Sequence, residues 1–209
     1  MEKDEEDSYV FMSGINALAA LATVVPEKTM PSLLNIFTAW DQSQRSTELR
    51  VLVGGVLAKL LEQQGHVSRT YAEQILAVFL ALCNDEDDAI RTSAFSDLAS
   101  LVAVEGFKTS GCVNEIAHCI NKAIQFDKSP MVRRGAAYLI RCLIKGSGNE
   151  MLNQLSPVIS DLYKNVKWLQ ENDNDSTVQF HATICLQEID KIMHELLTSD
   201  QTKVSRISV

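Results

Sequence analysis

One recurring pattern restricts the fold of this chain more than any other feature. Five segments align on an apolar anchor residue, and successive anchors are 39, 41, 42 and 46 residues apart. An apolar or small residue follows each anchor after four positions, and another apolar residue follows after eight. This spacing places the three residues on one face of a helix. The anchors are Val10, Leu49, Ile90, Val132 and Val178.

An Asp or Ser stands three positions before every anchor. Its side-chain oxygen can accept hydrogen bonds from the backbone N–H groups that lack partners at the start of a helix. Pro130 directly follows Ser129 and suits the first helical position, and the Ser-Pro pair recurs at residues 156–157. The predicted helix caps are therefore Asp7, Ser46, Asp87, Ser129, Ser156 and Asp175.

The acidic run Asp85-Glu86-Asp87-Asp88 precedes one of these helices. A cation site is the alternative interpretation, but such a site needs ligands at loop spacing and a Gly bend, which the run lacks. We expect Asp87 to cap the helix and its neighbours to lie where the helix dipole favours negative charge.

The segments between the five capped helices also have helical spacing, and alternating strand-like runs are absent. We predict helices at 7–25, 29–41, 46–64, 69–84, 87–105, 112–127, 129–146, 156–172 and 175–197. A period near 40 residues built from helix pairs is typical of HEAT or armadillo repeats. The predicted fold is all-α: an α-solenoid of HEAT-like hairpins with about nine helices, forming a right-handed superhelix over residues 7–197. The acidic residues 1–6 and the aperiodic tail 198–209 are predicted to be disordered.

The first predicted helix has no partner helix before it. Its sequence, "VFMSGINALAALATVV", is apolar on nearly every side, whereas the terminal repeat of a solenoid should have a polar outer face. We infer that the chain is the C-terminal part of a longer array, with upstream repeats or a covering partner at this end.

Composition excludes several classes of function. The net charge of −8 argues against direct nucleic-acid binding, which depends on clustered positive charge. No apolar run is long enough for a membrane span. The five cysteines include no Cys-x-x-Cys pair, and we expect buried, reduced thiols in a reducing compartment.

The sequence offers little for catalysis. His181 and Cys185 are four residues apart and could share a metal, but no second pair completes a ligand set. The sequence contains no HExxH, Walker, GxGxxG or GxSxG motif. We expect no enzymatic activity, no metal and no cofactor.

The predicted helix 129–146 is basic. Arg134, Tyr138, Arg141 and Lys145 have 4-3-4 spacing and form a stripe on one face, here called the basic stripe. One interpretation is a docking site on the concave face for an acidic segment of a partner protein, because Arg forks bind carboxylates. The alternative is a solvated face, partly neutralised by acids such as Asp97 or Glu188.

Arg91 and Arg133 each follow an anchor by one residue. We expect these two arginines to be structural and to pair with acids of the cap regions between repeats.

Several stretches of the chain resemble the C-terminal region of the transport and Golgi organization protein 6 family. They are "DSYVFMSGINALAAL", "AIRTSAFSDLASL", "VRRGAAYLIRCLIKG", "DLYKNV" and "FHATICLQEIDKIM", and together they span nearly all of residues 7–195. The same region is shared with a fungal factor for RNA polymerase II assembly and nuclear import.

This resemblance implies a helical-repeat scaffold or adaptor without enzymatic activity that acts in protein secretion and Golgi organisation. The alternatives are an adaptor for RNA polymerase II assembly and nuclear import, or a karyopherin-like carrier. The expected location is the cytoplasm, with shuttling to the nucleus or peripheral association with the Golgi as further expectations.

Overall fold

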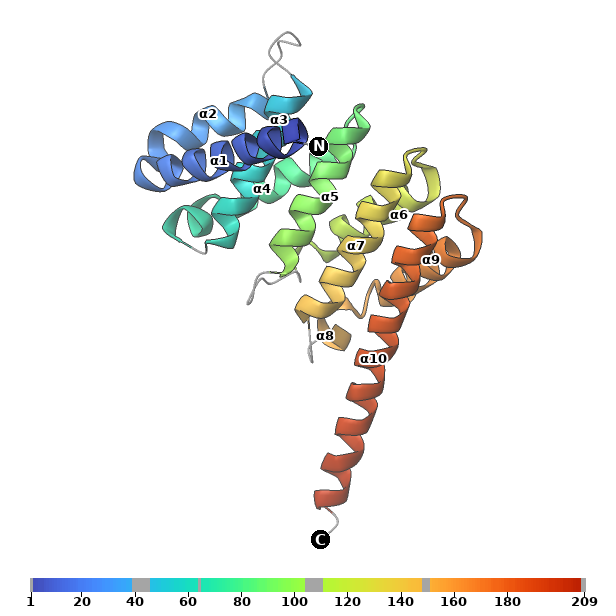
Figure 1. Cartoon of the computed structure of the whole chain (residues 1–209). Coiled ribbons are helices and arrows are strands. Elements are labelled where there is room, and N and C mark those ends of the chain that lie inside the picture. The colour runs from blue at the N-terminus through green and yellow to red at the C-terminus, as the bar shows by residue number, and fades with distance from the viewer. Residues whose placement is uncertain (1, 39–45, 64, 104–110, 148–150, 208–209) are drawn as a thin grey trace. The chain divides into compact units, whose positions relative to one another are not determined.

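The structure is a computed structural model that describes residues 2–38, 46–63, 65–103, 111–147 and 151–207. Helices are the regular secondary structure of these residues, and none of them forms a strand (Figure 1). Each of the nine predicted helices has a counterpart. The predicted all-α fold class is confirmed, while the stacking of the hairpins into one right-handed superhelix stays a prediction.

The chain divides into two compact units, Met1–Leu101 and Val102–Val209. The helices of unit 1 are α1 (Glu2–Val24), α2 (Pro26–Thr38), α3 (Thr47–Glu62), α4 (His66–Leu82) and α5 (Asp88–Ala103). Those of unit 2 are α6 (Val113–Phe126), α7 (Pro130–Ser147), the short α8 (Met151–Leu155), α9 (Ile159–Asn172) and α10 (Ser176–Ile207).

In unit 1, α3 packs against α1, α2 and α4. Two adjacent glycines let α3 approach its neighbours closely. A side chain on Gly55 would stand 2.7 Å from Ile15 Cδ1 of α1, and one on Gly54 would stand 2.8 Å from Asp97 Oδ2 of α5. The absence of side chains at these two positions therefore brings three helices together.

In unit 2, α7 and α10 lie side by side, and α6 and α9 pack beside them (Figure 1). The predicted inward faces are buried here, because Val132, Ala136 and Ile140 of α7 and Val178 and Ala182 of α10 are inaccessible to solvent. In unit 1 the anchors Val10 and Leu49 are exposed, so the predicted burial of these two anchors is wrong.

Three predicted caps make the expected hydrogen bonds. Ser46 Oγ accepts from the N–H of Leu49 at 3.1 Å. Asp87 Oδ1 accepts from the N–H of Ala89 at 2.9 Å, and Asp175 Oδ1 accepts from the N–H groups of Thr177 and Val178, each at 2.9 Å. Ser129 immediately precedes α7, and its carbonyl accepts from the N–H of Arg133 at 3.2 Å.

Two predicted caps are wrong. Asp7 lies within α1, which begins at Glu2, because the preceding Glu-Lys-Asp-Glu-Glu residues contain no helix breaker and acids suit the first turns of a helix. Ser156 and Pro157 lie in a turn between α8 and α9, in which the N–H of Val158 donates to the carbonyl of Leu155. Val158 therefore takes the N-cap position of α9, without a side-chain hydrogen bond.

The described helices extend into the two ends of the chain, whose predicted disorder stays a prediction. Residues 2–6 belong to α1, and α10 continues to Ile207. The sequence from Ser176 to Ile207 contains neither Gly nor Pro, so nothing breaks the helix where its apolar periodicity fades. Residues 1, 208 and 209 lie outside the described part of the chain.

The arginines after the anchors hold the turns between helices. Arg133 binds Asp173 through Nε at 2.6 Å and Nη2 at 2.9 Å, and its Nη1 donates to the carbonyls of Asp127 and Lys128. Asp173 Oδ1 also accepts from the N–H of Asp175 at 2.9 Å. Arg133 therefore fastens its own turn to the turn that starts α10, and its predicted structural role is confirmed.

Unit 1 contains a similar arrangement. Arg50 of α3 pairs with Asp85, and Asp85 Oδ1 accepts from the N–H of Asp87 at 3.0 Å. Arg91 donates to the carbonyls of Asp85 and Glu86 at 2.8 and 2.9 Å, as an arginine with a structural role should.

Asp87 accepts a second hydrogen bond besides the one that caps α5. Its Oδ2 accepts from the hydroxyl of Thr47 at 2.5 Å, and this bond lowers the pKa of Asp87 against the effect of burial. Asp85 and Asp87 of the acidic run thus bind other groups of the protein. Among the described residues, no group of three His, Cys, Asp or Glu side chains is placed to hold a metal ion.

We predict that Arg133→Met lowers the free energy of unfolding of unit 2 by about 3 kcal/mol, because it leaves the carboxylate of Asp173 buried without its partner. The side chain of Asp173 is only 2% exposed. Burial raises the pKa of Asp173, but the bonds from Arg133 and from the Asp175 N–H outweigh it, and the net shift is downward. The stabilisation is therefore present above pH 3.8, the ordinary value, and is lost as the pH falls.

Urea denaturation of the Arg133→Met variant and of the Arg133→Met/Asp173→Asn double variant measures this effect. The double variant should recover part of the loss, because it removes the unpaired charge. Equal stability of Arg133→Met and the wild type would contradict the assignment.

We predict that the stability of unit 1 depends on pH in the opposite sense, because of Asp97. Burial raises the pKa of this carboxyl to about 7, although the Ser93 hydroxyl donates a hydrogen bond to it at 3.4 Å. Because the folded state holds the proton more tightly than the unfolded state, the stability of unit 1 should fall as the pH rises from 3.8 toward 7, by up to about 4 kcal/mol. Asp97→Asn should flatten this dependence, which thermal unfolding at pH 5 and pH 8 measures. An unchanged slope in the variant would contradict the prediction.

Candidate functional site

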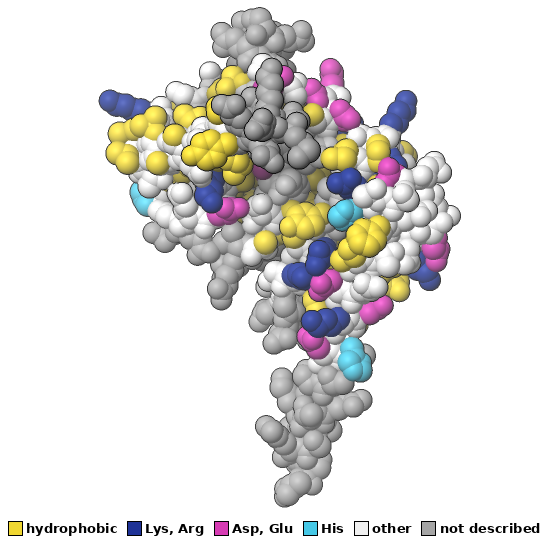
Figure 2. All heavy atoms as spheres, viewed as in Figure 1, with side chains coloured by type: hydrophobic (Ala, Val, Ile, Leu, Met, Phe, Trp, Pro, Cys, Tyr) yellow, Lys and Arg dark blue, Asp and Glu magenta, His cyan; other side chains and the backbone are white. Residues whose placement is uncertain are grey.

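The outer face of α1 is an apolar surface that the described helices of unit 1 leave uncovered. Ile15, Ala19 and Ala22 point inward and are buried. The opposite face carries Tyr9, Val10, Leu21 and Val24, which are 75%, 64%, 49% and 77% exposed. Figure 2 shows hydrophobic side chains gathered over this part of unit 1.

This face also lacks charge. The sequence contains no Asp, Glu, Lys or Arg from Ser8 to Pro26, although charged residues make up 22% of the chain. Small residues, Ser13, Ala17 and Ala20, are exposed along the same helix. We call Tyr9, Val10, Ser13, Ala17, Ala20, Leu21 and Val24 the α1 face. A helix can approach such a surface closely without desolvating an ion.

The basic stripe lies on α7, as predicted, but much of it faces α10. Arg141 Nη2 and Lys145 Nζ both bind Glu188 Oε1 of α10, each at 3.1 Å. The bond from Lys145, together with that from Arg141, outweighs burial and lowers the pKa of Glu188. The Nε of Arg141 is buried and has no hydrogen-bond partner among the described residues.

Arg134 and Tyr138 complete the stripe. The side chain of Tyr138 is 45% exposed. The charge of Arg134 acts on His181 of α10. Burial, and then the charges of Arg134 and Arg141, lower the pKa of His181. The structure therefore gives Arg141 and Lys145 an internal partner, Glu188, which is one of the two acids that the alternative interpretation named. The binding of an acidic segment by the stripe stays a prediction.

Cys185, one turn after His181 in α10, suits a packing role. Cys185 is inaccessible, and burial raises the pKa of its thiol to about 12, so the thiolate that binds metals is disfavoured. All five cysteines are buried, as predicted, and none of them forms a disulfide.

Comparisons with known proteins agree with the sequence pattern. A family model described as "Required for nuclear transport of RNA pol II C-terminus 1" matches residues 3–67, from α1 to the start of α4. A second, described as "Required for nuclear transport of RNA pol II C-terminus 2", matches residues 158–191, which include α9 and the first half of α10.

A curated relative is similar over almost the whole chain. Transport and Golgi organization protein 6 of Drosophila melanogaster is 21% identical over 198 residues, which are 94% of this chain. The predicted resemblance is confirmed. The matched residues are 21% of the relative, so the chain spans about a fifth of that protein's length. The descriptions of the two family models and the name of the relative all concern transport. No helix among the described residues is long and apolar enough to cross a bilayer.

We predict that Arg141→Glu lowers the free energy of unfolding of unit 2 by about 1–2 kcal/mol, because it replaces an attraction to Glu188 with a repulsion and disturbs a partly buried contact. Arg134→Glu serves as the control on the same helix and should change stability by less than half as much. Chemical denaturation of both variants measures the difference. Equal effects of the two substitutions would contradict the assignment of Glu188 to Arg141.

Proposed function

We propose that this chain is a non-enzymatic scaffold or adaptor for protein interactions that acts in protein secretion and Golgi organisation. The observation that carries the scaffold role is the α1 face, an exposed helix surface of apolar and small side chains without a charged residue. The role in secretion rests on the similarity to transport and Golgi organization protein 6.

The proposed occupant of the α1 face is the apolar side of another helix. Helices pack by fitting side-chain ridges of one into grooves of the other, and the small residues Ser13, Ala17 and Ala20 provide a shallow groove between Val10 and Leu21. Upstream repeats of a longer chain supply such a helix in one arrangement, and a covering partner protein supplies it in the other. The relative has most of its length outside the match, which supports the first arrangement.

A second function is favoured by the two family models, whose descriptions name nuclear transport of RNA polymerase II. Under this alternative the chain is an adaptor for polymerase assembly and nuclear import, or a karyopherin-like carrier. The proposed location is cytoplasmic under both functions. Peripheral association with the Golgi belongs to the first, and shuttling to the nucleus belongs to the second.

The basic stripe is a further proposed contact for an acidic segment of a partner, now centred on Arg134 and the exposed Tyr138. Its other members, Arg141 and Lys145, already share Glu188. A partner carboxylate would therefore compete with Glu188 for them. The α1 face needs no such exchange and is the stronger candidate.

Crosslinking mass spectrometry in cells tests the proposal. The tagged chain is compared with a Leu21→Glu/Val24→Glu variant, and a Ser160→Glu/Gln187→Glu variant adds the same charge at exposed polar positions of α9 and α10. We expect crosslinks to α1 in the wild type and in the control, and their loss in the α1 variant. Circular dichroism should show equal helicity in all three proteins.

The identity of the crosslinked proteins separates the two functions. Components of the secretory pathway support the first function, and polymerase subunits or nucleoporins support the second. If the α1 variant keeps every crosslink of the wild type, the scaffold role of the α1 face is wrong.

A further inference from the structure

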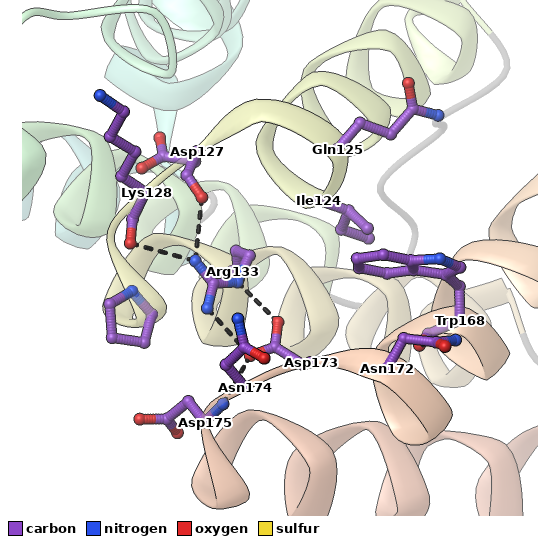
Figure 3. Close-up of a pocket in the computed structure, with 11 residues that line it drawn as sticks. Ile124, Gln125, Asp127, Lys128, Arg133, Trp168, Asn172, Asp173, Asn174 and Asp175 are labelled. Atoms are coloured by element: carbon purple, nitrogen blue, oxygen red, sulfur yellow. Dashed lines mark hydrogen bonds and ion pairs between the residues drawn. The ribbon is translucent and has the colours of Figure 1, made fainter.

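Unit 2 contains an open groove that none of the predicted sites uses. It lies between the turn that joins α6 to α7 and the turn that joins α9 to α10 (Figure 3). Its volume of about 470 Å³ falls in the range of ligand-binding clefts. Ile124, Gln125 and Trp168 line one part of the groove, and the polar residues of the two turns line the rest.

The floor of the groove is a neutral, fully engaged ion pair. Figure 3 shows the guanidinium of Arg133 between Asp173 and the backbone of Asp127 and Lys128. Three of its nitrogens already donate to oxygen atoms of the protein. Arg133 is therefore a fixed support and cannot be the group that selects an anionic ligand.

The side chains that line the walls of the groove determine which ligand fits. Trp168, on the last turns of α9, is 48% exposed and presents its indole to the groove. The face of an indole ring attracts cations and also packs well on the methylene groups of Lys and Arg. This side chain is too exposed for a core residue, and no described helix covers it.

The charge and the hydrogen-bonding groups of the lining also favour a cationic ligand. Apart from the Arg133–Asp173 pair, the charged lining consists of Asp127, Asp175 and Lys128, which leaves one negative charge in excess. The amides of Gln125, Asn172 and Asn174 also line it, and such amides can pair with the backbone of an extended peptide.

We propose that this groove binds an extended segment of a partner protein that carries a Lys or Arg side chain. The aliphatic stem packs on the indole of Trp168, the cationic head lies toward the carboxylate of Asp175, and the amides hold the peptide backbone. This site is separate from the α1 face and does not depend on the function proposed above.

The test uses the full chain and three blocked pentapeptides: Ala-Lys-Ala-Arg-Ala, Ala-Glu-Ala-Glu-Ala and Ala-Gln-Ala-Gln-Ala. Isothermal titration gives the affinities, and the indole N–H signal of Trp168, assigned with the Trp168→Phe variant, reports binding at the groove. We expect the basic peptide to bind with a Kd below about 1 mM and to shift this signal. The other two peptides should bind at least tenfold more weakly.

Variants separate the groove from general attraction to an acidic protein. Trp168→Ala should weaken binding of the basic peptide at least tenfold, while Trp168→Phe should keep most of it. Asp175→Asn should weaken binding severalfold and keep the helix cap, because an Asn oxygen also accepts from backbone N–H groups. Tyr163→Ala removes an exposed aromatic ring from a different face of α9 and should leave the Kd unchanged.

Three results would overturn the proposal: no binding of the basic peptide at 1 mM, tighter binding of the acidic or neutral peptide, or equal losses in Trp168→Ala and Tyr163→Ala. The crosslinking test of the α1 face can fail or succeed independently, because none of these variants touches α1.

Discussion

The burial of apolar helix faces against neighbouring helices within each unit is the interaction on which this structure depends. No single helix can cover its own apolar side, so each one needs a neighbour. In unit 2, α7 and α10 cover each other's apolar sides. Their inward faces are inaccessible to solvent, and Arg133 joins the turns from which the two helices start. In unit 1, α3 does the same for α1, and Gly55 allows their close approach at Ile15. The outer side of α1 is where this mutual coverage stops.

That asymmetry connects the fold to the proposed function. A terminal helix that needed no partner would carry Lys and Glu on its outer face, as most solvent-facing helices do. The outer face of α1 has Tyr9, Val10, Leu21 and Val24 in those places. Because exposing these side chains costs free energy, a second apolar surface placed on them stabilises both. The same physical term that holds the described helices together thus provides the affinity for the proposed occupant.

Much of the fold follows from local sequence rules. Ser46, Asp87 and Asp175 cap their helices because one side-chain oxygen at a fixed spacing satisfies the first N–H groups, whatever surrounds it. The errors come from two sources. Asp7 shows that a good cap does not begin a helix when no helix breaker precedes it. The residues after 197 show that a loss of periodicity does not end a helix when no Gly or Pro follows. Ser156 shows that a Ser-Pro pair also fits a turn, so its local signal is ambiguous.

The candidate sites were harder to predict because they depend on residues far apart in the sequence. The 4-3-4 spacing of the basic stripe is correct, but Glu188 stands 47 residues after Arg141, and only the packing of α10 on α7 brings them together. Asp85 and Asp127 stand six residues before Arg91 and Arg133, a regularity in the sequence that could have indicated the bonds from these arginines to the carbonyls of the turns. No local signal indicates the groove beside Trp168, because its two walls come from separate hairpins.

Hydrogen–deuterium exchange of the isolated chain tests most directly whether every helix depends on a neighbour that α1 lacks on its outer side. The amides of α1 from Val10 to Val24 should exchange faster than those of α3 from Val53 to Leu61, which lie among α1, α2 and α4. Protection of α1 equal to that of α3, in a protein shown by sedimentation to be monomeric, would contradict the account.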